Sequence, residues 1–296
     1  MSVLSNPQGT PERVWSLVAG LSALGGSAIR STYDGLLNPG YSKDGVELRA
    51  KDTLASNAHG AALSLKLVEA GREQATLTIA SPASFDGFAD HVHDRLAGLT
   101  AGDTDAPILE AFAWVVAESD KRGGMEWIYQ TGRDEFADLA NAALIGEDDD
   151  GKIMNSTKAV AWRRWLAFMG LGLAMPLERA PDFPTPVERI VRELQRAGIA
   201  GGSVLLAGEF TTLLASRMPY LDRGRLFNQA CQRIGHSPAA GRLSPLLSVA
   251  LRELHDEGTL QLRVSGDAAE RVRLSEDSAH AIDAFSTVVV FPSPDQ

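Results

Sequence analysis

The chain has 296 residues, of which 44% are hydrophobic and 22% are charged. These values are ordinary for a folded globular protein, and they exclude a disordered, collagen-like or fibrous chain. The single cysteine, Cys231, excludes an intramolecular disulfide and suits a reducing cytoplasm, where we expect the protein to be found.

The net charge of −10 is unevenly distributed along the chain. Residues 81–151 carry 4 basic and 16 acidic side chains, whereas residues 1–80 are balanced and residues 152–296 are slightly basic. The acidity of the whole chain therefore does not exclude nucleic acid as a partner of the flanking segments.

No membrane partner is expected. The N-terminal residues have neither a basic region nor a long apolar run, so they do not form a signal peptide. The most apolar stretch, Trp165 to Leu177, is shorter than the ~20 residues that a spanning helix needs, so we expect it to form a buried core helix.

Residues 10–80, after a short tail, have the pattern of a winged-helix module. We expect helices from Pro11 to about Leu24, from Ser27 to about Leu37 and from Thr53 to Ala70, and then a strand from Gln74 to Ile79. The third helix of such a module usually enters a DNA groove, so Lys51 and Asn57 are candidate DNA-contacting residues. Because the module has no net charge, a protein-binding or structural role is favoured here.

Residues 81–176 are expected to form an acidic helical middle domain. Its last helix begins near Asn155 and carries Trp162 and Trp165 on its apolar face. The prolines between Pro176 and Pro186 mark the boundary to a C-terminal module, residues 185–296.

The C-terminal module contains the most specific pattern in the chain. Ser244-Pro245 begins a helix whose apolar residues recur at helical spacing. Two alternating strands, Thr259–Val264 and Glu270–Ser275, follow it and predict a β-hairpin. A capped helix followed by a hairpin with basic outer positions is typical of the recognition helix and wing of a winged helix.

Six residues of this module are candidates for contact with double-stranded DNA. We expect Ser248, Arg252 and His255 to share the outward face of the helix, and Arg263, Arg271 and Arg273 to point outward from the hairpin. Arginine can donate two parallel hydrogen bonds to phosphate oxygens. The alternative is a solvated strand face whose charge prevents edge pairing. A second arginine stripe, Arg189, Arg192 and Arg196, is expected to be a solvated helix face paired with Glu188 and Glu193.

No pattern of catalytic residues is found. The chain lacks the glycine-rich motifs of nucleotide-binding loops and the serine elbow of hydrolases. His91 and His93 lack a second pair of metal ligands, and Cys231 lacks an activating partner. We therefore expect no enzymatic activity, no cofactor and no metal.

Four segments of the chain resemble a known family, DpdG: Asn6-Pro7-x-Gly9-Thr10-Pro11-x-Arg13-Val14, Leu63-Ser64-Leu65-x-Leu67-Val68-Glu69-x-Gly71, Trp165-x-x-Phe168-x-Gly170-Leu171-Gly172 and Pro219-Tyr220-Leu221-Asp222-x-Gly224-Arg225. DpdG is an uncharacterised component of bacterial islands that insert 7-deazaguanine bases into DNA and restrict foreign DNA. The resemblance implies a role in bacterial genome defence beside helicase and nuclease partners. It brings no catalytic residues.

Together these observations predict a mainly helical protein with small β-hairpins, in which tandem winged-helix modules flank a helical middle domain. The predicted function is a non-enzymatic DNA-binding or adaptor subunit of a bacterial DNA-modification and phage-defence complex. The alternative is a protein-binding accessory subunit of a chromosome-organising ATPase complex, which the arrangement of tandem winged helices also resembles.

Overall fold

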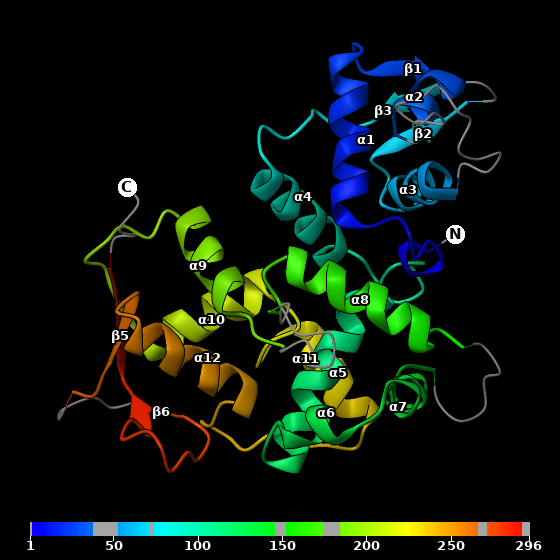
Figure 1. Cartoon of the computed structure of the whole chain (residues 1–296). Coiled ribbons are helices and arrows are strands. Elements are labelled where there is room, and N and C mark those ends of the chain that lie inside the picture. The colour runs from blue at the N-terminus through cyan, green and yellow to red at the C-terminus, as the bar shows by residue number, and fades with distance from the viewer. Residues whose placement is uncertain are drawn as a thin grey trace. The chain divides into compact units, whose positions relative to one another are not determined.

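The computed structural model describes residues 2–37, 53–71, 74–145, 152–173, 184–265 and 271–291. The chain is mainly helical and has small antiparallel sheets, as predicted (Figure 1). It divides into two compact units: Met1–Ala106 with Thr157–Met169, and Pro107–Ser156 with Gly170–Gln296. No helix of the described residues is both long enough and apolar enough to cross a membrane.

The first unit is built around one three-stranded antiparallel sheet with the strand order β1-β3-β2. Its elements are η1 (Val3–Ser5), α1 (Pro11–Ala23), β1 (Ser27–Ile29), α2 (Arg30–Leu37), α3 (Thr53–Ser64), β2 (Val68–Ala70), β3 (Gln74–Leu77), α4 (Phe85–Ala97) and most of α8 (Ser156–Phe168).

Five aromatic rings join α8 to α1 and α4 inside the first unit. The ring of Phe168 lies 4.8 Å from that of Phe85 and 5.3 Å from that of Phe88. Trp15 contacts Phe88 at 5.3 Å, and Trp165 contacts Phe168 at 5.7 Å. Offset and edge-on ring pairs at these distances stabilise a core beyond their area burial.

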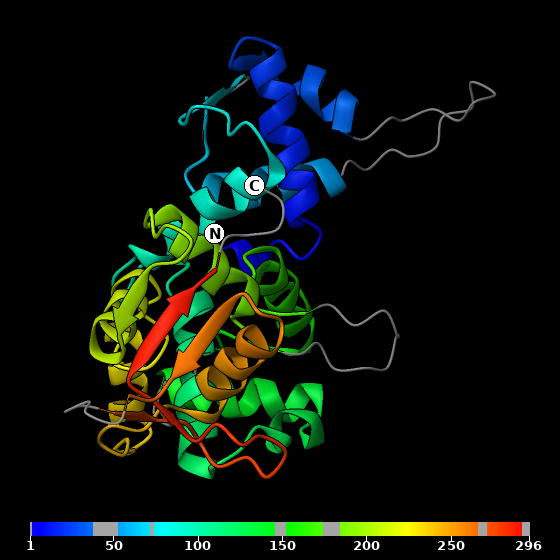
Figure 2. The ribbon, with the colours of Figure 1, turned by 90° about the vertical axis from the view of Figure 1, so that its left-hand side faces the viewer.

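The second unit contains a three-stranded antiparallel sheet and a two-stranded sheet. Its elements are α5 (Pro107–Arg122), α6 (Glu126–Gln130), α7 (Arg133–Ile145), α9 (Val187–Arg196), β4 (Val204–Leu206), α10 (Ala207–Arg217), α11 (Arg225–Arg233), α12 (Pro245–Asp256), β5 (Leu260–Arg263), β6 (Val272–Arg273), β7 (Ala284–Phe285) and β8 (Thr287–Val290). Figure 2 shows β8 lying between β4 and β5.

Helix α5 is the central helix of the second unit. Most of its side chains are buried, including the unbroken run from Ile108 to Ala117. It packs against α11, α12 and α7, and the rings of Phe112 and Tyr220 meet edge to face at 5.2 Å. A helix that is buried on nearly all sides forms the interior of its unit.

The two units share one order of elements. In the first, α1, β1, α2, α3, β2 and β3 follow one another, and β1 pairs with β3. In the second, α9, β4, α10, α12, β5 and β8 occur in the same order, and β4 pairs with β8. The second unit adds α11 before α12, and the β6-β7 pair before β8.

Several expected elements differ from the structure. The helix expected over Thr53–Ala70 ends at Ser64, because Lys66 adopts a left-handed backbone conformation and the chain then enters β2. A helix was expected to begin at Ser27, but Ser27–Ile29 form the strand β1, which pairs with β3, and the helix α2 begins at Arg30. The buried core helix expected over Trp165–Leu177 ends at Phe168, and Leu173 is exposed.

Within the part of the chain that the structure describes, the predicted hairpin between Thr259–Val264 and Glu270–Ser275 does not form. Strand β5 pairs with β8, and β6 pairs with β7. Alternation shows which residues face inward but does not identify the strand to which they pair. Val288 and Val290, late in the chain, give β5 a more apolar partner than β6 could, since they lie opposite Leu262 and Leu260.

Candidate nucleic-acid interface

The two-stranded sheet has one apolar face and one basic face. Val272 lies opposite Phe285, and both are completely buried. Residues next to each other along a strand point to opposite faces, so Arg271 and Arg273 share the outward face. The backbone of Arg242 forms a parallel bridge with Arg273. Arg242 therefore points outward beside Arg273, because residues paired across a ladder share a face.

We call Arg242, Arg271 and Arg273 the arginine face. The side chains of Arg271 and Arg273 are exposed, as predicted, and within the described residues neither forms an ion pair. Arg242 is 41% exposed, and its Nη2 atom lies 3.6 Å from Oδ1 of Asp120. Two of the three guanidinium groups are thus available to an external anion.

The arginine face lines a cavity of about 600 Å³. The remaining lining residues include two carboxylates, Glu276 and Asp283, and apolar side chains such as Val264. The cavity therefore offers both hydrogen-bond donors and acceptors to a ligand.

Arg263 is exposed, as predicted, but lies on the other sheet. Its Nε and Nη2 atoms donate to Oε1 of Gln261 at 2.9 and 2.7 Å, on the same face of β5. Because β5 pairs with β8 and not with β6, Arg263 is not part of the arginine face.

The expectation that Ser248 and Arg252 point outward from α12 is wrong. Both are buried, because the loop between β6 and β7 covers this side of the helix. Nη2 of Arg252 donates to the carbonyl oxygens of Ser275 at 2.7 Å and Ile282 at 2.9 Å. Oγ of Ser248 accepts from the backbone N–H of Ser275.

His255 also has a structural contact within the second unit. The half-buried imidazole accepts a hydrogen bond from the backbone N–H of Leu262 through its Nδ1 atom. Helix α12 therefore uses all three of its candidate residues to hold neighbouring backbone.

In the first unit, the N-terminal segment covers a face of α3. Val3 and Leu4 are buried, so residues 2–9 are not the short tail that was expected. Asn57 is half-buried, and its Oδ1 atom accepts from the N–H of Gln8. Ser64, two turns further along, donates to Asp105, which also accepts from Ser2 and the N–H of Val3. Lys51 lies outside the described residues.

A buried group of titratable side chains lies beneath α12. Asp120 accepts a hydrogen bond at 2.7 Å from Nε2 of His236. Asp222 accepts from both the N–H and the hydroxyl of Ser244, each at 2.6 Å. Burial raises the pKa of Asp222 to about 6. Ser244 is itself the N-cap of α12, so this group anchors a helix.

Cys231, in the same region, is an unreactive thiol. It is buried, and burial together with the charges of Asp120 and Asp222 raises its pKa to about 12. Because the thiolate is the nucleophilic form, this environment suppresses its reactivity.

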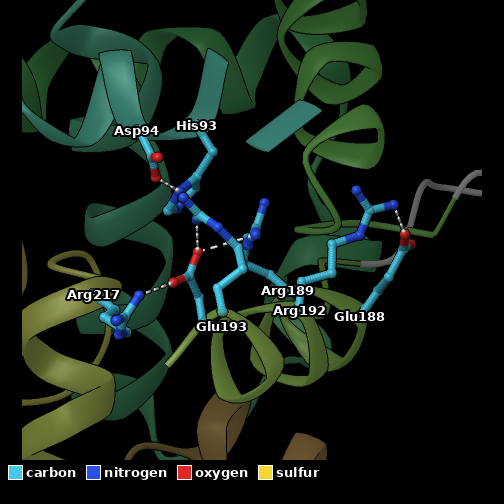
Figure 3. Close-up of polar contacts among 8 residues, drawn as sticks. His93, Asp94, Glu188, Arg189, Arg192, Glu193 and Arg217 are labelled. Carbon is cyan, nitrogen blue, oxygen red and sulfur yellow. Dashed lines mark hydrogen bonds and ion pairs between the residues drawn. The ribbon is translucent and has the colours of Figure 1, made fainter. Parts of the chain in front are cut away.

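The second arginine stripe is not the solvated face that was expected. Arg189 is completely buried, and Glu193 is 2% exposed. The Glu193 carboxylate lies 3.0 Å from Arg189, 2.6 Å from Arg196 and 3.1 Å from Arg217 (Figure 3). Arg217, on α10, supplies the contact that helical periodicity of α9 alone could not predict.

Sequence reasoning did not identify Arg242 as a candidate. The signal available was the alternation of Gly241, Arg242 and Leu243, in which only the leucine is buried. This three-residue pattern is too short to predict a strand without its partner.

One of the motifs that carry the resemblance to DpdG, residues 219–225, has a structural role. A Cβ atom on Gly224 would lie 2.3 Å from the carbonyl oxygen of Pro219, so only glycine fits this turn. Asp222 and Tyr220, in the same motif, are buried in the contacts described above.

Comparison with known proteins identifies a family. No curated protein and no solved structure matches the chain. The family model described as DpdG-like matches residues 1–268, which include Arg242 and Arg263 and end before Arg271. Because the match covers most of the chain, this protein belongs to the DpdG-like family.

Proposed function

We propose that this protein is a non-enzymatic subunit of the Dpd DNA-modification system that binds double-stranded DNA through its second unit. Family membership associates the chain with that system and with its other proteins. The contacts would be made by the arginine face, with Arg263 as a further contact from β5.

A tandem winged-helix arrangement is part of this proposal, and the order of the elements supports it. In a winged helix, the first strand of a three-stranded sheet follows the first helix, and two strands follow the third helix and form the wing. The orders β1-β3-β2 and β4-β8-β5, with their helices, agree with this arrangement in both units. The β6-β7 pair would then be an elaboration of the C-terminal wing.

The arginine face is the observation that carries the proposal. It presents exposed guanidinium groups from one small sheet, and these can contact successive phosphate oxygens. The candidate base-contacting residues of α12 are turned inward, so the proposed contact is with the DNA backbone and is insensitive to base sequence.

A binding measurement tests the proposal. Fluorescence anisotropy with a labelled 20-base-pair duplex should show that Arg271→Ala/Arg273→Ala weakens binding at least about tenfold at low salt. The slope of log affinity against log salt should fall by about 2, one for each lost phosphate contact.

The matched control removes two positive charges elsewhere in the same unit. Arg133 and Lys152 are exposed, and α7, which begins at Arg133, lies far from β6 in Figure 1. Arg133→Ala/Lys152→Ala should retain most of the affinity. Equal loss in the two double variants, or no loss in either, would overturn the proposal.

One observation favours the alternative function, a protein-binding accessory subunit. Strand β4 lies at the edge of its sheet and exposes Val204 and Leu206, at 60% and 58%. Exposed apolar side chains on a sheet edge are typical of protein contact sites. Under this alternative, the protein would co-purify with a partner at 1:1 stoichiometry and the complex would resist high salt and nuclease.

A further inference from the structure

The cavity at the arginine face has opposite charges that do not pair with one another. Arg273 lines it from β6 and Arg271 from the position just before β6, while Glu276 and Asp283 line it from the loop between β6 and β7. Within the described residues, no ion pair joins these four side chains. A phosphate contact would use only the arginines, so the carboxylates give the cavity a second kind of binding group, a hydrogen-bond acceptor.

Backbone hydrogen bonds hold the segments that carry these charges. Arg273 lies opposite Ala284 in the ladder, and the N–H of Leu274 donates to the carbonyl oxygen of Asp283. The backbone of Arg273 is also bonded on its other side, to Gly241 and Leu243. These hydrogen bonds fix the backbone positions from which the side chains extend. Such preorganisation lowers the entropic cost of binding a ligand.

The size and lining of the cavity suit a single nucleotide. Its volume of about 600 Å³ lies in the middle of the range of small-molecule sites, roughly 300–1,000 Å³. Guanidinium groups bind phosphate, and carboxylates accept hydrogen bonds from the amino groups of bases, as from N4 of cytosine. The exposed apolar side chain of Val264 offers contact to a base.

We infer that this cavity binds one unpaired nucleotide of DNA, with its phosphate on Arg271 and Arg273 and the amino group of its base on Glu276 or Asp283. The inference rests on the proposed function, because the same arginines bind the backbone. It adds that the protein prefers DNA in which one amino-bearing base is extruded from the stack.

Three labelled duplexes test this inference with the full chain. One is fully paired, one carries a single bulged dC, and one carries a single bulged dT, whose base has no amino group. The wild-type protein should bind the bulged-dC duplex about tenfold more tightly than the other two, since hydrogen bonds to the edge of a base discriminate against a base that lacks the donor.

Glu276→Gln/Asp283→Asn removes the acceptor charges without removing volume. This variant should bind all three duplexes with similar affinity, because the preference for bulged dC is lost while the arginines remain. Glu135→Gln/Asp138→Asn, on α7, removes the same charge elsewhere in the second unit and should keep the preference.

The outcomes separate the two proposals. If Arg271→Ala/Arg273→Ala weakens binding to the paired duplex but the wild type does not prefer bulged dC, the nucleotide site is wrong and the proposed function stands. A preference that survives Glu276→Gln/Asp283→Asn also overturns the site. If Arg271→Ala/Arg273→Ala changes the affinity for none of the three duplexes, both proposals fail.

Discussion

Glu193 is a buried carboxylate in contact with three guanidinium groups, and of these Arg189 is completely buried. Breaking a buried ion pair by removing one partner is costly, because it leaves a buried charge uncompensated. We therefore expect Glu193→Gln to lower the free energy of unfolding by about 3 kcal/mol, as measured by urea denaturation.

The same helix supplies the control for this substitution. Glu188 pairs with Arg192 on the surface of α9 and is 57% exposed. Surface pairs contribute between about 0 and 1 kcal/mol, so Glu188→Gln should be nearly neutral. Similar effects of the two substitutions would contradict the assignment of Glu193 to a buried network.

Asp222 predicts a pH-dependent stability. Its pKa is raised by burial from 3.8 to about 6, so the folded state holds the proton more tightly than the unfolded state does. As the pH rises from 4 to 6, the unfolded state ionises first and the free energy of unfolding falls, by up to about 3 kcal/mol. Asp222→Asn removes this dependence and keeps an acceptor for Ser244.

The measurement for Asp222 is the difference in unfolding free energy between Asp222→Asn and wild type across pH 4 to 7. The difference should increase with pH in favour of the variant. Asp103 is the control of opposite sign, because hydrogen bonds from Thr100 lower its pKa, so Asp103→Asn should lose stability relative to wild type as pH rises. A difference for Asp222→Asn that does not change with pH would contradict its raised pKa.

At the residue scale, the sequence predicts exposed charged side chains better than it predicts buried ones. Arg263, Arg271 and Arg273 alternate with apolar residues, and strand alternation alone places them outward. Arg252 and Arg189 also lie opposite apolar faces of their helices, yet both are buried. Arg252 donates to the carbonyl oxygens of Ser275 and Ile282. Arg189 pairs with Glu193, and Glu193 also pairs with Arg217 on another helix. Local periodicity does not reveal the contacts made by residues farther along the chain.

At the scale of elements, residues 2–9 form a segment that fits closely on α3. A Cβ atom on Gly9 would lie 2.5 Å from the backbone oxygen of Asn57 and 2.9 Å from Cβ of Ala61. Because a backbone atom cannot move aside locally, Gly9→Ala should lower stability by about 1–3 kcal/mol. Hydrogen exchange should show faster exchange in residues 2–10 and in α3.

Gly20 is the matched control, since it lies inside α1 with no atom within 4 Å of an added Cβ. Alanine has the higher helix propensity, so Gly20→Ala should raise stability by up to about 1 kcal/mol. If Gly9→Ala were as well tolerated as Gly20→Ala, the N-terminal segment would not be packed on α3.

Element starts were predictable where capping residues mark them. Helices α1 and α12 begin at Pro11 and Pro245, directly after the capping residues Thr10 and Ser244. Ser244 accepts the expected hydrogen bond from the N–H of Leu247. The short strand β1 and the pairing of β5 were not predictable in this way. Both depend on partners distant in sequence, β3 and β8, and strand pairing leaves no local signature.

At the scale of the whole molecule, the chain leaves the first unit at residue 106 and returns to it in α8. The sequence alone places α8 in the middle domain, because the proline-rich segment from Pro176 to Pro186 that marks the domain boundary follows it. The ring of Phe168 instead packs on Phe85 and Phe88 of α4. The stability of the first unit should therefore depend on a helix about 60 residues beyond the end of α4.

Phe168→Ala tests this dependence. Phe168 is half-buried, so the substitution should cost about 2 kcal/mol, below the range for a fully buried phenylalanine. Hydrogen exchange should then accelerate in peptides from α1 and α4, while peptides from α5 and α11 keep their protection. Phe136→Ala, which removes ring contacts with Trp114 and Trp127 in the second unit, should give the reverse pattern. Uniform acceleration in both units after either substitution would show that they open as one body, and α8 could then not be assigned to the first unit by its stability.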